Sequence, residues 1–203
     1  MADMAPGFRI RSSAAVCAAL LAGAPAIAAG ERATFELDPE HTVVAFFVSH
    51  VGFAKVLGKF DAVEGSFVLD EEAGTLGNVE VVVETESVST DHPARDRHLR
   101  SDDFLASDRH PRIRFTAVDA RPTGEHTYDI NGRLELRGVT QPLTLHATLN
   151  KIGEHPIEDR AYVVGVSVRG TLRRSDFGMT YALDNGWVGD EVELLVEFEA
   201  RRQ

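Results

Sequence analysis

Cysteine is nearly absent from this chain. Its 203 residues include a single one, Cys17, which excludes an intrachain disulfide and any zinc site built from several thiolates. A chain of this length buries roughly 70% of the surface that its unfolded form exposes, so it needs no metal or disulfide to hold a fold together. We therefore expect an ordinary hydrophobic core to supply the stability.

Positive charge is also scarce. The chain carries 21 Lys and Arg against 32 Asp and Glu, a formal net charge of -11. Nucleic-acid binding depends on clustered Lys and Arg that neutralise phosphates, and attraction to anionic lipid depends on the same residues. The composition therefore predicts no nucleic-acid partner and argues against docking on anionic membranes.

The common catalytic and metal-binding motifs are missing. The sequence has no G-x-S-x-G, H-E-x-x-H or Walker motif. Asp176-Phe177-Gly178 matches a kinase triplet, but the other kinase elements are absent. His92 and His98 with His110 suggest a surface metal site, yet positions six apart on a helix do not face one metal, so capping roles are favoured. We predict no catalytic residue, no metal and no required cofactor.

Long hydrophobic runs are limited to one, at the N-terminus. Residues 14–29 form an Ala-rich apolar run that follows Arg9 and Arg11 and contains Ala26-Ile27-Ala28, a small-x-small cleavage site. This order is typical of a secretory signal peptide, and the run is too short for a confident membrane span. We expect residues 1–28 to be cleaved and residues 29–203 to form one domain in the periplasm. No other segment approaches the ~20 apolar residues that cross a bilayer, so we expect no transmembrane segment after cleavage.

The rest of the chain has the pattern of β-strands. Alternating segments rich in Val, Phe, Thr and Leu are separated by Gly, Pro, Asn and Asp, and Asp38-Pro39 predicts a turn. No alternation of strands and helices appears, which excludes Rossmann-type folds. Eight or so strands with short connections indicate an all-β sandwich or barrel. The expected strands are residues 34–37, 41–50, 58–69, 79–88, 113–120, 127–137, 141–150, 161–174 and 191–200.

One segment has a helical pattern. Thr90 or Asp91 can cap a helix start, and Pro93 suits the first turn. We predict a short polar helix over residues 94–100 and a second helical turn over 102–106. This 90–110 segment is the exception in an otherwise all-β chain.

Five polar residues are candidates for a ligand rim. Arg95 and Asp96 are about 100° apart on a helix, which favours an Arg–Asp network that pins the helix. The alternative is that Arg95 or His98 meets an anionic head group. Arg174 likewise is either part of a structural network or a contact for an anionic head group. His50 ends an apolar strand face, so it is either a core residue or a polar contact at a pocket mouth, with neither favoured.

Several short motifs follow one another in a set order. Together they resemble the YceI-like family of lipocalin-like polyisoprenoid-binding proteins over nearly the whole of residues 29–203. Leu105 and His110 stand where that family often has aromatic residues. The motifs are Asp38-Pro-Glu-His41, Val44-x-Phe46-x-Val48-x-His50, Gly58-x-Phe60, Arg95-Asp96-x-His98-Leu99-x-Ser101-x-Asp103-Phe104, Gly132-x-Leu134-x-Leu136 and Arg174-Ser-Asp176-Phe-Gly178-Met179.

The resemblance implies an eight-stranded extended antiparallel β-barrel, lipocalin-like, with a short helix in the 90–110 segment. It also implies that the barrel holds an isoprenoid lipid, either a polyprenyl phosphate or a quinone-type amphiphile, for transport, storage or protection. Two alternatives stay open: an accessory enzyme that acts on an isoprenoid quinone through His50, His98 and Arg174, and an envelope stress module without a ligand. A homodimer is compatible with the sequence.

Alternation and the resemblance together name candidate ligand contacts. A barrel filled by its own side chains shows the same alternation as a hollow one, so the tunnel is implied by the resemblance alone. The expected head-group or rim residues are His50, Arg95, Asp96, His98 and Arg174. The expected lining or end-closing residues are Val44, Phe46, Val48, Phe60, Phe67, Val81, Val83, Phe104, Phe115, Leu134, Leu136, Phe177, Met179 and Trp187.

Overall fold

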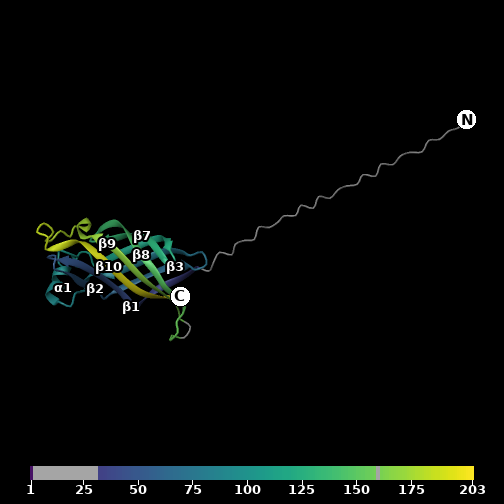
Figure 1. The fold of residues 1–203 in the computed structure, drawn as a ribbon, viewed down its shortest axis with the longest axis horizontal. Helices are drawn as coiled ribbons and strands as arrows, with labels where there is room; N and C mark the ends of the chain where they lie inside the picture. Colours follow the sequence, from purple (N-terminus) through teal and green to yellow (C-terminus); the bar gives the residue numbers. More distant parts are fainter. Residues whose placement is uncertain (2–31, 159–160) are drawn as a thin grey trace.

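The protein is a β-barrel with one short α-helix at one end (Figure 1). The structure, a computed structural model, describes residue 1 and residues 32–158 and 161–203. The expected signal peptide, residues 1–28, lies outside the described residues apart from Met1, so its cleavage stays a prediction.

Eight strands form a closed ring. Each pairs antiparallel with its neighbours, and the last strand pairs with the first, which leaves no open edge along the ring. The expected eight-stranded antiparallel barrel is therefore confirmed. In ring order the strands are β1 (Arg32–His50), β3 (Val63–Asp70), β4 (Thr75–Glu84), β6 (Arg112–Gly124), β7 (Thr127–Leu136), β8 (Val139–Glu154), β9 (Tyr162–Arg173) and β10 (Val188–Arg202).

Strand β1 is longer than the sequence predicted. The prediction of a turn at Asp38-Pro39 is wrong, because β1 continues through these residues as a bulge. Leu37 pairs with Ala200, and the next paired residue on β1, Thr42, pairs with Phe198. Between these two pairs the chain moves five residues along β1 but only two along β10. The three extra residues change the phase of the strand. Odd-numbered residues before the bulge and even-numbered residues after it therefore face the barrel interior.

The strand predicted over residues 58–69 is two strands. β2 (Ala54–Phe60) pairs with the C-terminal half of β1, and β3 pairs with its N-terminal half. The break falls at Asp61 and Ala62. On its other side β2 pairs only with β5 (Val88–Ser89), through Lys59 and Phe60. The barrel wall is therefore less complete beside β2, where residues 54–58 have a strand partner on one side only.

The predicted helix is present with different boundaries. α1 (Pro93–Arg100) is capped by His92, whose Nδ1 accepts a hydrogen bond from the Arg95 amide at 3.2 Å, and not by Thr90 or Asp91. Ser101 is the C-cap, and residues 102–106 form turns and not a second helical turn. Two 3-10 helices, η1 (Thr85–Ser87) and η2 (Arg174–Phe177), complete the described secondary structure.

The barrel has two distinct ends. One end is formed by residues 51–53, helix α1 and residues 178–187, and we call it the mouth end; Figure 1 shows it on the left. The far end consists of the β3–β4, β6–β7 and β8–β9 connections, and the C-terminus lies there. Between the ends, the core includes Phe35, which is fully buried and stacks on Phe67 with ring centroids 5.5 Å apart.

Candidate ligand cavity

A cavity of about 690 Å³ extends through the barrel interior. Its lining includes Glu71 and Gly74 at the far end, and His98 and Trp187 at the mouth end. The volume falls in the upper part of the roughly 300–1,000 Å³ range of small-molecule sites. The barrel is therefore hollow along its length, which the sequence pattern alone left open.

The predicted lining residues meet at this cavity with one exception. Phe177 was expected to close an end, but its side chain is 3% exposed and packs into the core at η2 without reaching the cavity. The structure therefore places Phe177 in the packed core at η2 and does not bring it to the cavity. The residues that line the cavity as predicted are Val44, Phe46, Val48, Phe60, Phe67, Val81, Val83, Phe104, Phe115, Leu134, Leu136, Met179 and Trp187.

Strands β8, β9 and β10 supply lining residues that the sequence reasoning missed. They alternate as regularly as the residues that were found, so the same signal could have identified them. Tyr181, by contrast, lies in a loop where no periodic signal exists. The missed residues on these three strands are Leu143, Leu145, Ala147, Leu149, Ile152, Val164, Val166, Val168, Leu172, Val188, Val192, Leu194, Val196 and Phe198.

Two glycines leave room for aromatic rings against the barrel wall. A Cβ atom at Gly58 would lie 2.2 Å from the Phe46 ring, and one at Gly132 would lie 2.3 Å from the Phe115 ring. Both distances are far below any tolerated contact. Each ring therefore covers a neighbouring glycine, and a side chain at the glycine would push the ring toward the cavity. This arrangement helps to explain why a barrel rich in phenylalanine is not filled.

Arg95 and His98 lie at the mouth and line the cavity. Arg95 Nε donates to Thr90 Oγ1 at 2.7 Å and Nη2 donates to the Thr90 carbonyl at 2.8 Å, which fixes the guanidinium. His98 Nε2 is 2.9 Å from Asp103 Oδ2, and its ring packs edge-on against Tyr181. Helix α1 thus presents two basic side chains to the opening, where His50 also lies.

Asp96 does not reach the cavity. Its carboxylate is buried and accepts hydrogen bonds from the Thr90 amide at 2.8 Å and from the Thr90 hydroxyl. Burial alone would raise the pKa of this carboxyl, but the hydrogen bonds from Thr90 lower it below its usual value. The rim role expected for Asp96 is wrong, and the helix-pinning role that the sequence favoured is the one observed.

Arg174 borders the cavity but is engaged by the backbone. Arg174 is 2% exposed, and its guanidinium carbon lies over the Phe104 ring, 5.8 Å from the ring centroid. Burial lowers the pKa of this guanidinium, and the Asp190 charge acts in the opposite direction. Arg174 therefore holds the chain around the mouth together. It donates to the carbonyls of Gly189 at 2.7 Å, Met179 at 2.7 Å, Tyr181 at 2.9 Å and Val188 at 2.8 Å.

A separate polar group lies at the β1 bulge, and its side chains are not among those that line the cavity. Asp38, His41 and Glu199 place one ligand atom each within 4.8 Å of one another, as a metal site would. However, Arg201 Nη2 donates to Asp38 Oδ2 at 2.7 Å, so a cation is already present. Burial raises the pKa of Asp38, but hydrogen bonds from His41, Arg201 and the Glu40 amide outweigh it and lower the pKa to about 2. The arrangement is that of an ion-paired bulge.

A closed antiparallel barrel with an apolar axial cavity and polar groups at its ends defines a lipocalin-like β-barrel. Within this class the chain belongs to the YceI family, because it matches the YceI-like domain over residues 35–200. The resemblance seen in the sequence is thereby confirmed.

Relatives and solved structures agree with this assignment. A UPF0312 protein of Pseudomonas aeruginosa is 37% identical over 190 residues, covering 92% of this chain and 97% of the relative. One from Pectobacterium carotovorum is 37% identical over 184 residues, covering 91% and 93%. The crystal structure of a Campylobacter jejuni YCEI protein has a TM-score of 0.67 at 25% identity, covering 76% of this chain and 90% of that one.

A more distant structure shares the fold. A polyisoprenoid binding domain from Saccharophagus degradans, implicated in plant cell wall breakdown, has a TM-score of 0.63 at 14% identity, covering 83% of this chain and 98% of that one. Among the helices in the described part of our chain, none has the length and apolar character required to cross a bilayer.

Proposed function

We propose that this protein binds an isoprenoid lipid inside the barrel and has no catalytic activity of its own. The observation that carries the proposal is the cavity, which is apolar through the middle of the barrel and has its charged side chains only at the ends. Burying a hydrocarbon chain contributes about 0.8 kcal/mol per CH₂-sized unit, so a long tail supplies affinity without specific polar contacts. The polyisoprenoid-binding neighbour from Saccharophagus supports this class of ligand.

The mouth end suits the head group of such a lipid. Arg95 and His98 both reach the cavity there, and Arg95 uses only Nε and Nη2 in its hydrogen bonds to Thr90. Glu71 lies at the far end and would repel an anion. The charges thus favour a polyprenyl phosphate over a neutral quinone, with the head at the mouth and the tail directed toward Glu71.

We place the mature protein in the periplasm, where it would carry, store or protect the lipid. The support is the order of Arg9 and Arg11, the apolar run over 14–29 and the small residues at its end. N-terminal sequencing of the protein from a fractionated cell tests the placement, and a chain that retains residue 1 in the cytoplasmic fraction would contradict it. A homodimer, which the sequence allows, would double the mass in light scattering.

Ligand extraction tests the binding proposal. Organic extracts of the purified protein, analysed by mass spectrometry, should contain a prenyl lipid. Ala147→Trp is the matching variant, because Ala147 lines the cavity and is 5% exposed. The larger side chain should occupy the cavity and remove the bound lipid.

The adjacent residue provides the control. Thr148 is exposed on the outer face of β8, so Thr148→Trp should retain the lipid. If the wild-type protein yields no lipid and takes up neither polyprenyl phosphate nor quinone, the binding proposal fails. If Ala147→Trp retains the same lipid, the ligand is bound outside the barrel.

A further inference from the structure

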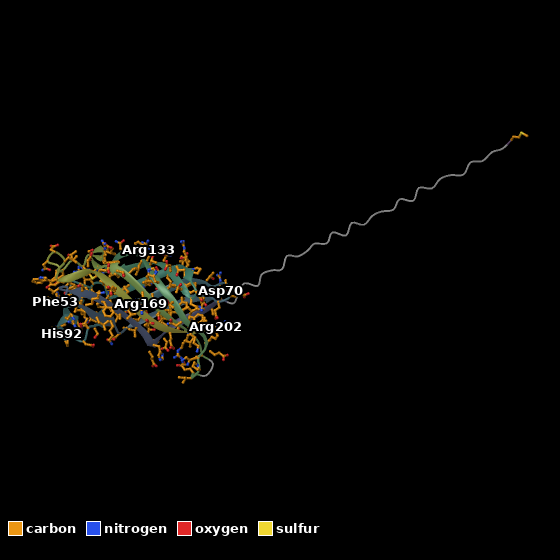
Figure 2. All side chains as sticks on the ribbon, viewed as in Figure 1. Phe53, Asp70, His92, Arg133, Arg169 and Arg202 are labelled. Carbon is orange, nitrogen blue, oxygen red and sulfur yellow. The ribbon has the colours of Figure 1, made fainter. Side chains whose placement is uncertain are left out.

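Large apolar side chains are exposed around the mouth. Phe53 is 92% exposed at the tip of the β1–β2 turn, and Trp187 is 58% exposed in the loop before β10. Val51 and Tyr181 are exposed beside them. Figure 2 shows Phe53 at the mouth end, opposite the end that carries Asp70 and Arg202. We call Val51, Phe53, Tyr181 and Trp187 the mouth patch.

The segments that carry the mouth patch are almost free of charge. Residues 49–54 and 178–189 contain one formally charged side chain, Asp184, in a chain that is 26% charged. The far-end turn over residues 70–75, by comparison, contains Asp70, Glu71 and Glu72. The lack of charge is therefore a feature of these two mouth loops and not of every loop in this protein.

The mouth patch is continuous with the cavity. Val51, Tyr181 and Trp187 line the cavity as well as being exposed. The two loops are joined directly, since the Val51 amide donates to the Trp187 carbonyl at 2.8 Å. Val51 has a φ of 52°, which a β-branched residue rarely adopts, so this turn keeps an unfavourable backbone to present its residues here. An apolar surface thus leads from the outside of the molecule into the barrel.

We propose that the mouth patch docks on the neutral surface of a lipid bilayer, so that a lipid passes between bilayer and cavity without crossing water. This inference rests on the proposed function, because the ligand would be a membrane lipid. Phe and Trp are side chains that partition into the membrane interface. The net charge of -11 gives no attraction to anionic lipid, so the contact depends on apolar burial and should be insensitive to salt.

The single tryptophan makes the docking directly observable. Trp187 is the only tryptophan in the chain, so its fluorescence reports the mouth alone. Phosphatidylcholine vesicles should shift the emission to the blue, and brominated phosphatidylcholine should quench it, equally at low salt and at 0.5 M salt. An N-terminal segment that bound the vesicles by itself would not bury Trp187.

Two matched variants test which surface docks. Phe53→Asp should weaken vesicle partition by at least about tenfold, which corresponds to 1.4 kcal/mol. Ile157→Asp changes a residue of comparable exposure, 88%, in the β8–β9 loop of the far end, and should bind as the wild type does. Unquenched Trp187, or equal partition of Phe53→Asp and the wild type, would overturn the inference.

Uptake from detergent micelles separates this inference from the proposed function. Phe53 does not line the cavity, so Phe53→Asp should take up polyprenyl phosphate from micelles normally and from vesicles slowly. Uptake from micelles without vesicle docking would refute the docking and leave the proposed function standing. Vesicle docking without uptake from either source would refute the lipid-carrying function.

Discussion

The two ends of the barrel border one cavity but differ in chemistry. At the mouth, two loops with a single charged side chain, Asp184, border an opening that also includes the basic side chains of Arg95 and His98. At the far end, Glu71 accepts a hydrogen bond from Tyr162 Oη at 2.7 Å, and buried Asp70 accepts one from the Ala73 amide at 2.9 Å. The cavity lining thus carries basic side chains beside apolar loops at one end and a carboxylate at the other.

The difference gives the cavity a direction. A lipid with an anionic head would be attracted to the mouth and repelled by Glu71, while its tail is accepted by the apolar middle. Exposed apolar loops lower the cost of passing a hydrocarbon chain into the barrel, and charged turns raise it. The two ends therefore predict a single entrance. Variants that affect one end only can test this comparison.

The largest expected effect comes from removing the side chain that holds the mouth together. Arg174→Ala would leave four backbone carbonyls of residues 179–189 without their donor. Unsatisfied buried acceptors cost about 1–3 kcal/mol each, so we expect a loss of about 3 kcal/mol in total after relaxation. For a domain of this size that lowers Tm by about 10 °C, measurable by circular dichroism.

The neighbouring arginine is the control for this variant. Arg173 is exposed, so Arg173→Ala should change Tm little. Equal stability of Arg174→Ala and the wild type would show that the mouth loops are held by other contacts. Arg174 would then be available for a ligand head group.

The second prediction concerns the far half of the barrel, where the β1 bulge is held by ionised Asp38. Its folded pKa of about 2 lies below the unfolded value near 3.9, so its stabilisation is present above pH 4 and is lost as pH falls through 2. Asp38→Asn should therefore lose about 2 kcal/mol at neutral pH. Urea unfolding at pH 7 and pH 3 measures the difference, which should be smaller at pH 3.

Exposed Glu40 provides the comparison for Asp38. Glu40→Gln should leave the stability and its pH dependence close to wild type. An Asp38→Asn protein whose deficit stays constant between pH 7 and pH 3 would show that the carboxylate charge is not what stabilises the bulge. The hydrogen bond to Asp38 raises the pKa of His41.

The third prediction tests the direction of the ligand. Arg95→Gln should weaken binding of a polyprenyl phosphate about tenfold relative to an uncharged polyprenol, since a charged hydrogen bond to the head is lost. Glu71→Gln at the far end should leave that ratio unchanged. Competition binding in detergent measures both ligands with each protein. If Arg95→Gln weakens both ligands equally, Arg95 acts only by positioning α1 through Thr90.

The same contrast shows how much the sequence could predict. Alternation along the strands is a local signal, so the all-β class and part of the cavity lining followed from it, whereas the closed barrel and its tunnel were implied by the family resemblance. The continuation of β1 through Asp38-Pro39 did not, because it depends on pairing with β10, some 160 positions away in the chain. A turn-forming dipeptide was outweighed by long-range pairing and by the Asp38–Arg201 ion pair.

The mouth was harder to predict than the barrel wall. The partners of Arg174 are backbone carbonyls, which carry no sequence signal, so its role became visible only in the folded chain. The hollow interior depends on pairs such as Gly58 with Phe46, which meet only through the β1–β2 register. Exposure of Phe53 and Trp187 follows from the loop geometry and not from any periodicity.

The smallest expected effect is at the far end. Tyr162→Phe removes the hydrogen bond to Glu71, a contact that also raises the pKa of Tyr162. Because Glu71 is exposed, water can replace the lost donor, and the free energy of unfolding should fall by less than about 1 kcal/mol. The rate at which a fluorescent prenyl ligand dissociates should not change, since the ligand leaves by the mouth. Faster dissociation from Tyr162→Phe than from the wild type would mean that this hydrogen bond closes a second opening, and the barrel would then exchange its ligand at both ends.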